Sequence, residues 1–121
     1  MAAFAPAALK RVATMADGWN PVALPPDGMA QMFGLIQQMA RETGRDPSSL
    51  RMVVRANLEI SDKPLGKERM IFTGTLEQIQ EDVLACKRIG AHELFFDPTF
   101  YKGAQTLEGW LALMEQMRKF A

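Results

Sequence analysis

The chain has 121 residues, enough for one domain with a core but far short of the roughly 250 residues of a complete eight-stranded barrel. Its 14 basic and 14 acidic residues cancel, and no stretch mixes Lys and Arg with aromatics, which argues against nucleic acid or membrane partners. The single cysteine, Cys86, excludes an internal disulfide and fits a reducing, cytoplasmic location. No segment approaches the roughly 20 apolar residues that span a bilayer.

The first part of the chain predicts two helices with a short extended segment between them. Residues 6–16 open with a proline, which suits the first turn of a helix, and carry one apolar face. Residues 19–22 (WNPV) predict a brief strand or an edge segment. The turn PPDG at 25–28 offers Asp27 as the N-cap of the second helix, which ends near Gly44. That helix has apolar residues at helical spacing: Met29, Met32, Phe33, Ile36, Met39 and Ala40.

The longest predicted strand is residues 50–60 (LRMVVRANLEI). Apolar and polar side chains alternate along it, which places Arg55, Asn57 and Glu59 on one face. In a parallel sheet covered by helices on its apolar side, these polar side chains point either into a barrel interior, where they line a ligand, or into solvent along an edge strand. The pattern leaves both possibilities open. A charged loop without periodicity follows at 61–72.

Residues 74–97 carry the strongest local signals. Thr75 followed by Gln78 is a capping-box pattern and predicts a helix start, and Gly90 supplies the left-handed residue that closes the helix. Glu93 to Phe96 then predict a short strand covered on both faces. The apolar face of the helix consists of Leu76, Ile79, Val83 and Cys86. The unit is a helix, a glycine turn and a buried strand.

Asp97 follows that strand and is the first candidate for function, because ligands bind at the carboxyl ends of parallel strands. The alternative is that it only caps the turn that Pro98 begins. His92 has no second histidine, and no phosphate loop or nucleophile elbow is present. Nothing in the sequence pairs Asp97 with the other candidate carboxylates, Glu59 and Asp62. No catalytic residue and no metal site can therefore be assigned.

Residues 107–120 predict the last helix, after a loop in which Phe100 and Tyr101 are expected to be exposed. The helix has a wide apolar face of Leu107, Trp110, Leu111, Met114, Met117 and Phe120. The order helix, glycine, strand occurs twice, with a further helix at each end. We therefore predict an α/β fold in a single domain, residues 1–121, with two or three parallel strands and four helices.

Three stretches together resemble the luciferase-like monooxygenase family, flavin- or deazaflavin-dependent oxidoreductases built on a TIM barrel. They are AALKRVATMADGWNPV at 7–22, RETGRDPSSLRMVV at 41–54 and GTLEQIQEDVLACKRIGAHELFFD at 74–97, in the order and spacing of the C-terminal third of such enzymes. The resemblance implies that the α/β domain is a partial TIM-barrel-like array of helix-strand units. It also implies FMN or a deazaflavin coenzyme and a small-molecule ligand. It makes Trp19, Asn57 and Asp97 the candidate cofactor-binding residues.

The chain also departs from the family pattern. Family members carry a strand and a glycine pair before the helix that matches residues 7–16, and this turn helps to hold the flavin phosphate. Residues 1–6 contain no glycine. Two functions stay open: a fragment or subunit of a flavin- or deazaflavin-dependent oxidoreductase, expected to be inactive as an isolated chain, or a non-catalytic α/β oligomerisation or interaction module derived from that family. We expect weak FMN binding or none in the isolated chain.

A homo-oligomer, most simply a two-fold dimer, is the predicted assembly. Four helices with wide apolar faces and at most three strands give more apolar surface than one layer can cover. Two faces are the candidates for the contact: Met29, Met32 and Ile36, or Trp110, Met114 and Met117.

Overall fold

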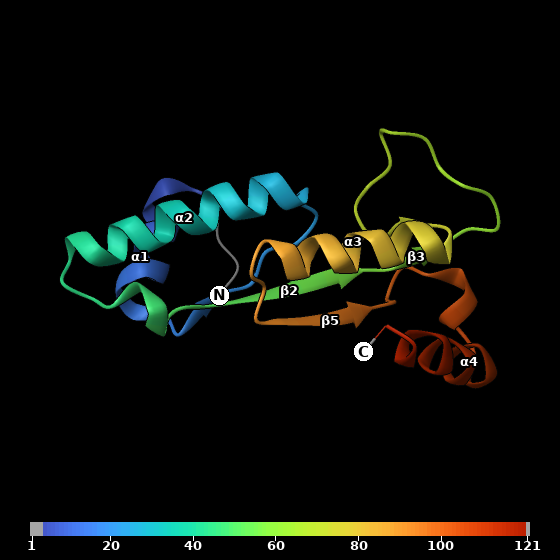
Figure 1. The fold of residues 1–121 in the computed structure, drawn as a ribbon. Coiled ribbons are helices and arrows are strands. Elements are labelled where there is room, and N and C mark those ends of the chain that lie inside the picture. Colours follow the sequence, from blue (N-terminus) through green and yellow to red (C-terminus); the bar gives the residue numbers. More distant parts are fainter. Residues whose placement is uncertain (1–3, 121) are drawn as a thin grey trace.

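The computed structural model describes residues 4–120, in which helices and short strands follow one another along the chain (Figure 1). The helices are α1 (Pro6–Met15), α2 (Pro26–Glu42), α3 (Leu76–Arg88) and α4 (Leu107–Arg118), with 3-10 turns η1 (Pro47–Ser49) and η2 (Lys102–Ala104). The strands are β1 (Gly18–Trp19), β2 (Arg51–Asn57), β3 (Glu59–Ile60), β4 (Thr73–Gly74) and β5 (Glu93–Asp97). The predicted α/β array of four helices and short parallel strands is confirmed. None of the helices in this part of the chain is long and apolar enough to cross a membrane.

The strands form two parallel sheets. The main sheet has the order β1-β2-β5, and β3 and β4 make a separate ladder of two residues each. Since β2 lies between two neighbours, it is not an edge strand. Within residues 4–120, β5 pairs only with β2, so the other edge of β5 is open.

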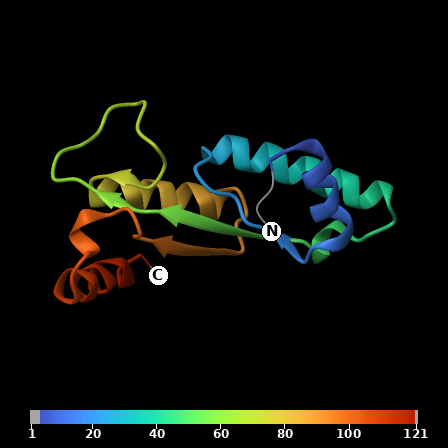
Figure 2. The same cartoon turned by 180° about the vertical axis from the view of Figure 1, so that it is seen from behind.

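Helices α2 and α3 cover one face of the main sheet. Seen from behind in Figure 2, β2 and β5 lie in front of α3 with no helix over them. Trp19 stacks on Phe33 with ring centroids 6.4 Å apart, which joins β1 to α2. The core between the sheet and these helices includes Trp19, Met29, Phe33, Ile36, Met52, Val54, Ala56, Ile79 and Cys86. Cys86 is buried, in agreement with its predicted place on the apolar face of the helix.

The local signals around α3 hold in the structure. The Thr75 hydroxyl accepts from the Gln78 backbone N–H at 3.3 Å, and Gln78 Oε1 accepts from the Thr75 N–H at 3.1 Å, which completes the predicted capping box. Gly90 closes the helix with a φ of 87°. At α2 the prediction is wrong, because the N-cap is Pro25 and Asp27 lies inside the first turn. A proline at the first helical position has no N–H to cap, so the helix starts before the aspartate.

Two predicted strands differ from the observed ones. The strand predicted to reach residue 60 stops at Asn57, and Leu58 turns its N–H to the Asp97 carbonyl at 2.9 Å. Glu59 therefore belongs to β3, which pairs with β4. The strand predicted to be covered on both faces, β5, is covered on one, and Phe95 is 43% exposed. An apolar run predicts burial, but whether a second layer covers it depends on elements that the local sequence does not contain.

Helix α4 does not bury its predicted apolar face as a unit. Its contacts with the core go through Leu113 and Met117, whereas Leu107, Trp110, Leu111 and Met114 remain exposed. In the preceding loop Phe100 is exposed as predicted, but Tyr101 is partly buried against the core. The α2 face that was one candidate for a dimer contact is used inside the chain, because Met29 and Ile36 are buried.

Candidate functional site

The polar side chains of β2 and β5 lie on the sheet face that α2 and α3 leave uncovered. Burial alternates along β2, with Met52, Val54 and Ala56 buried on the helix side. In the parallel register Arg55 is level with Phe95, and Asn57 is level with Asp97, which places each pair on one face. We call this surface, made of Arg55, Asn57, Phe95 and Asp97, the open face.

Arg55 and Asp97 form an ion pair on the open face. Arg55 Nε donates to Asp97 Oδ2 at 2.8 Å, and its Nη2 donates to the same oxygen. The other carboxylate oxygen, Oδ1, accepts from the Thr99 backbone N–H at 3.0 Å and from the Thr99 hydroxyl. Asp97 therefore caps the turn and also holds an arginine on the open face. Sequence reasoning named the first role, but nothing local shows the second, since Arg55 is 42 residues away.

The two hydrogen bonds from Thr99, and then the Arg55 guanidinium, lower the pKa of Asp97 below its ordinary value. The carboxyl group is therefore ionised at neutral pH. An ionised carboxylate with a lowered pKa is a poor general acid and a weak general base. Its role on this surface is to orient Arg55.

Asn57 carries the unsatisfied polar atom of the open face. Its Oδ1 is buried and has no hydrogen-bond partner within the residues that the structure describes. A buried acceptor without a partner costs about 1–3 kcal/mol, so this atom would gain from a donor supplied by a ligand. Asn57 also borders a cavity of about 180 Å³ at the carboxyl end of β2, whose other lining residues include Leu58, Ile71, Thr73 and Phe100. We call it the β2-end cavity.

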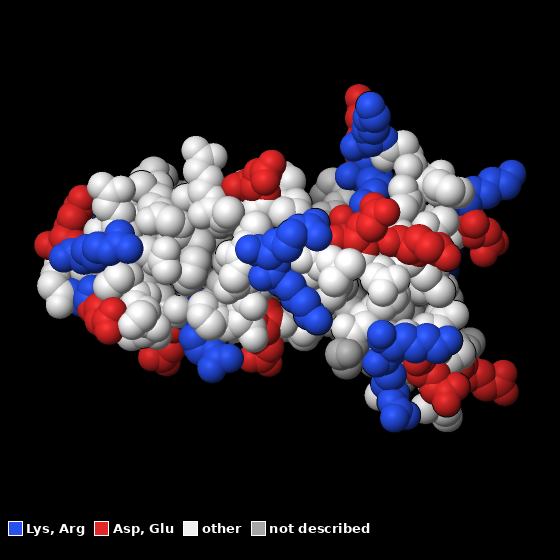
Figure 3. Space-filling view, viewed as in Figure 1, with Lys and Arg blue, Asp and Glu red and all other residues white. Residues whose placement is uncertain are grey.

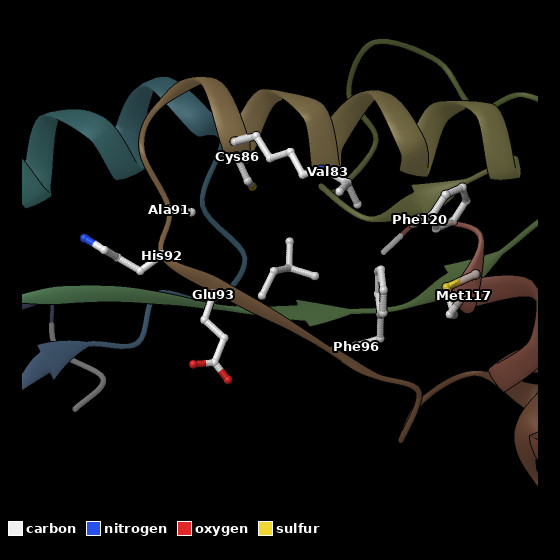
Figure 4. A pocket seen from close by; sticks show the side chains of 10 residues that line it. Val83, Cys86, Ala91, His92, Glu93, Phe96, Met117 and Phe120 are labelled. Carbon is white, nitrogen blue, oxygen red and sulfur yellow. The ribbon is translucent and has the colours of Figure 1, made fainter.

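A larger cavity of about 260 Å³ lies between α3, β5 and the end of α4 (Figure 4). Val83, Cys86, Phe96 and Met117 make it apolar, and the Glu93 carboxylate points away from it. Burial, with the Asp82 charge as a smaller cause, raises the pKa of the Cys86 thiol to about 11, so the thiol is not a nucleophile at neutral pH. Because most of its lining is apolar and its thiol is not ionised, we interpret this space as a gap in packing beside the open edge of β5.

The segment between β3 and α3 closes one side of the β2-end cavity and is tied to α3. Asp82 accepts from Arg69 Nη1 at 2.7 Å, from Arg69 Nη2 at 3.0 Å and from the Phe72 backbone N–H at 2.8 Å. Gln78 holds the same segment farther along, through both backbone groups of Leu65. Sequence reasoning missed this anchor. The available signal was a carboxylate at position 82, three residues after Ile79, on the apolar side of α3.

The structure brings together two of the three predicted site residues. Asn57 and Asp97 lie level on the open face. Trp19 is level with Met52 and is fully buried against Phe33, on the opposite side of the sheet.

His92 lies at the other end of β5, where its Nδ1 accepts from the Met52 backbone N–H at 3.0 Å. In residues 4–120 no three His, Cys, Asp or Glu side chains are placed to hold a metal ion.

The open face fits only part of a flavin. The acceptor Asn57 Oδ1 suits a ring N–H, but about 180 Å³ is less than the roughly 300–1,000 Å³ of pockets that enclose a ligand. Arg55 is the cation of the open face, and Asp97 already balances its charge. The face therefore suits the edge of a ring, and it does not suit the phosphate group.

Comparisons with known proteins show the family and the fold of the chain. A family model for luciferase-like monooxygenases matches residues 1–65, more than half of the chain. Curated proteins gave no match. The crystal structure of long-chain alkane monooxygenase (LadA) is similar, with a TM-score of 0.65 at 8% identity, over 98% of this chain and 40% of that chain. At this identity the likeness concerns the fold alone, and the chain spans well under half the length of that enzyme. By the family model, the chain belongs to the luciferase-like monooxygenase family.

Proposed function

We propose that this chain contributes the C-terminal strand-helix units of a luciferase-like flavin- or deazaflavin-dependent oxidoreductase, and that it does not catalyse the reaction as an isolated chain. The observation that carries the proposal is the open face. It places Asn57 and the Arg55–Asp97 pair at the carboxyl ends of two adjacent parallel strands, where barrel enzymes bind their ligands.

In this proposal each residue of the open face has a binding role. Asn57 Oδ1 accepts a hydrogen bond from the ring of the cofactor or from the substrate, because it is buried without another partner. Asp97 fixes the Arg55 guanidinium, which keeps further N–H donors for a ligand. The flavin, when bound, supplies the redox chemistry, and the chain supplies one wall of its site.

We expect the isolated chain to be inactive because the open face is exposed to solvent and has no unbalanced positive charge. Pockets bury most of a ligand's surface, whereas Phe95 on the open face is 43% exposed and no helix covers it. The charge of Arg55 is balanced within the face, so a phosphate gains little there. A ligand on this face alone would be held on one side only.

A titration with FMN at millimolar concentration, followed by NMR on the ¹⁵N-labelled chain, tests the proposal. Weak binding should shift the Asn57 side-chain amide, the Arg55 Nε–H and the Phe100 backbone amide. The Trp19 indole is an internal control and should not move, because it lies on the other side of the sheet. Shifts centred on Trp19 or on α1, with none at Asn57, would contradict the proposed wall.

We keep a second candidate, a non-catalytic oligomerisation or interaction module that forms a homodimer. One observation favours it, namely that four large apolar side chains of α4 are exposed. A chain that forms a stable dimer and shows no FMN-dependent shift on the open face would support this candidate over the first.

A further inference from the structure

The β2-end cavity presents hydrogen-bond acceptors to a ligand. Three polar residues belong to its wall, namely Asn57, Glu59 and Thr73. The Asn57 Oδ1 atom is buried and has no hydrogen-bond partner within residues 4–120. The Thr73 hydroxyl donates its proton to the Met70 carbonyl at 2.6 Å, so its oxygen is left as an acceptor. A ligand that brings N–H or O–H donors therefore suits this cavity.

The charge of the wall favours a cation. Glu59 is the charged residue among the described residues of the wall, and its carboxylate forms no ion pair within the described chain. Arg55, on the neighbouring open face, is not part of the wall and is already paired with Asp97. The outer part of the segment between β3 and α3 carries charges of both signs, but these side chains project away from the body of the molecule (Figures 1 and 3). An anionic ligand would therefore meet a negative charge that the wall does not balance.

Phe100 adds an aromatic surface to the same wall. Its side chain is 67% exposed, which places it at the rim of the cavity. The face of an aromatic ring attracts an ammonium group. Leu58, Met70 and Ile71 make other parts of the wall apolar. An acceptor, a carboxylate and an aromatic ring around a small apolar space are suited to an organic ammonium ion.

Asn57 can present its acceptor to a ligand without losing another contact. The amide torsion of asparagine is broad, so a rotation turns Oδ1 toward the cavity that Asn57 lines. This rotation breaks no hydrogen bond of Oδ1, because the atom has none within the described residues. A donor from the ligand then satisfies an acceptor that is costly to leave unpaired.

We propose that the β2-end cavity binds small primary amines with an apolar body, in their ammonium form. The ammonium N–H groups donate to Asn57 Oδ1 and to the Glu59 carboxylate, and Phe100 covers the charge. The apolar body lies against Leu58 and Ile71. A volume of about 180 Å³ keeps that body small, since pockets for drug-sized ligands begin at roughly 300 Å³. As the substrate class of the site, the amine rests on the oxidoreductase function proposed above, but its binding needs no flavin.

Three probes of the same shape test the class of ligand. Isopentylamine, isopentanol and isopentanoate share a branched apolar body, and at neutral pH their polar ends are a cation, a neutral donor and an anion. Each is titrated, without FMN, into the ¹⁵N-labelled chain and followed by NMR. Isopentylamine should shift the Asn57 side-chain amide and the Thr73 and Phe100 backbone amides, with a dissociation constant of about 1 mM. Isopentanol should bind several-fold more weakly, isopentanoate should not saturate, and the buried Trp19 indole should not move.

Two variants test the contacts. Asn57→Leu removes the acceptor and should raise the dissociation constant of isopentylamine about tenfold. Glu59→Gln removes the charge, so it should weaken isopentylamine several-fold and leave isopentanol unchanged. Glu115→Gln is the matched control, because Glu115 is exposed on α4 outside the cavity, and it should bind like wild type. Since Glu59 is exposed, the circular dichroism of its variant should match wild type, which keeps the test valid even if Asn57→Leu does not fold.

Isopentanoate that binds as tightly as isopentylamine would overturn the proposal, as would the absence of any shift with isopentylamine up to about 50 mM. Equal losses in Glu59→Gln and Glu115→Gln would also overturn it. FMN shifts on the open face without amine binding would reject the amine and leave the oxidoreductase function standing. Amine binding without FMN shifts would support the cavity and reject the flavin wall.

Discussion

Asp82 is the single side chain on which the order of the segment between β3 and α3 most depends. Its carboxylate accepts hydrogen bonds from both terminal nitrogens of Arg69, Nη1 and Nη2, and from the backbone N–H of Phe72. The backbone of Phe72 has a φ of 65°. That φ is unusual for a bulky residue, so the bonds to Asp82 stabilise a conformation that the chain would otherwise avoid. The pKa of Arg69 is raised by its hydrogen bond to Asp82, which keeps this arginine charged.

Replacing Asp82 with Asn should destabilise the protein by roughly 2–3 kcal/mol, because it leaves the charge of Arg69 uncompensated at a site that is only 16% exposed. Urea unfolding of the variant and of wild type measures the loss. Glu81→Gln is the matched control, because it removes a neighbouring charge at an exposed position. A free energy of unfolding for Asp82→Asn within about 0.5 kcal/mol of wild type would show that the anchor is not needed.

Acid should weaken the fold partly through Asp97. Its pKa in the folded chain lies below the ordinary value of about 3.9, so its stabilising contribution is present above about pH 4 and is lost as the pH falls through the folded pKa. Thr99→Val removes the hydroxyl donor, which should raise the pKa of Asp97 toward the ordinary value. A ¹³C NMR titration of the carboxyl group measures this change.

The control for that titration is Thr14→Val. The Thr14 hydroxyl donates to the Lys10 carbonyl and does not contact Asp97, so the Asp97 pKa should stay at its wild-type value. An unchanged pKa of Asp97 in Thr99→Val would mean that Thr99 does not cause the shift.

The capping of the turn by Asp97 was open to prediction because Thr99 is a near neighbour in sequence. The Arg55 pairing was not, because the sequence does not show which strands lie side by side.

Among the elements, β1 and β2 approach so closely that a glycine is required. A Cβ added at Gly18 would lie 2.5 Å from the Arg51 carbonyl oxygen, which is backbone and cannot move aside. At Gly34, in the middle of α2, an added Cβ would meet nothing within 4 Å.

The two glycine-to-alanine changes should therefore have opposite signs. Gly18→Ala should cost about 1–3 kcal/mol through forced separation of the strands, whereas Gly34→Ala should stabilise the helix by roughly 0.5–1 kcal/mol. Urea unfolding of both variants gives the comparison. Equal free energies of unfolding for the two variants would contradict the close approach of β1 to β2.

The elements were predictable to different degrees. The capping box, the glycine stop at Gly90 and the alternation along β2 are local patterns, and each appears in the structure. The uncovered face of β5 was not predictable, because burial depends on which elements pack on each face. Trp19 shows the same limit. The resemblance to the family suggested a cofactor contact for Trp19, but the register with Met52 turns its side chain into the core.

For the whole molecule, the sequence predicted an α/β partial barrel and its family, and the structure and the family model confirm both. The repeated order of helix, glycine and strand predicted an α/β fold, and the resemblance to the family predicted the partial barrel. The candidate site was predicted in part, since Asn57 and Asp97 lie level on the open face. Whether that face belongs to an enzyme or to an interaction module depends on surfaces that no local pattern describes.

The most direct test of the account is a titration of the wild-type chain with FMN, followed by flavin fluorescence. The open face lacks an uncompensated cation, and its Phe95 is 43% exposed, so we predict no saturation below about 100 μM. A dissociation constant of about 1 μM or below would contradict the account, because it would mean roughly 8 kcal/mol of binding from a chain that, on our proposal, supplies only one wall of the site.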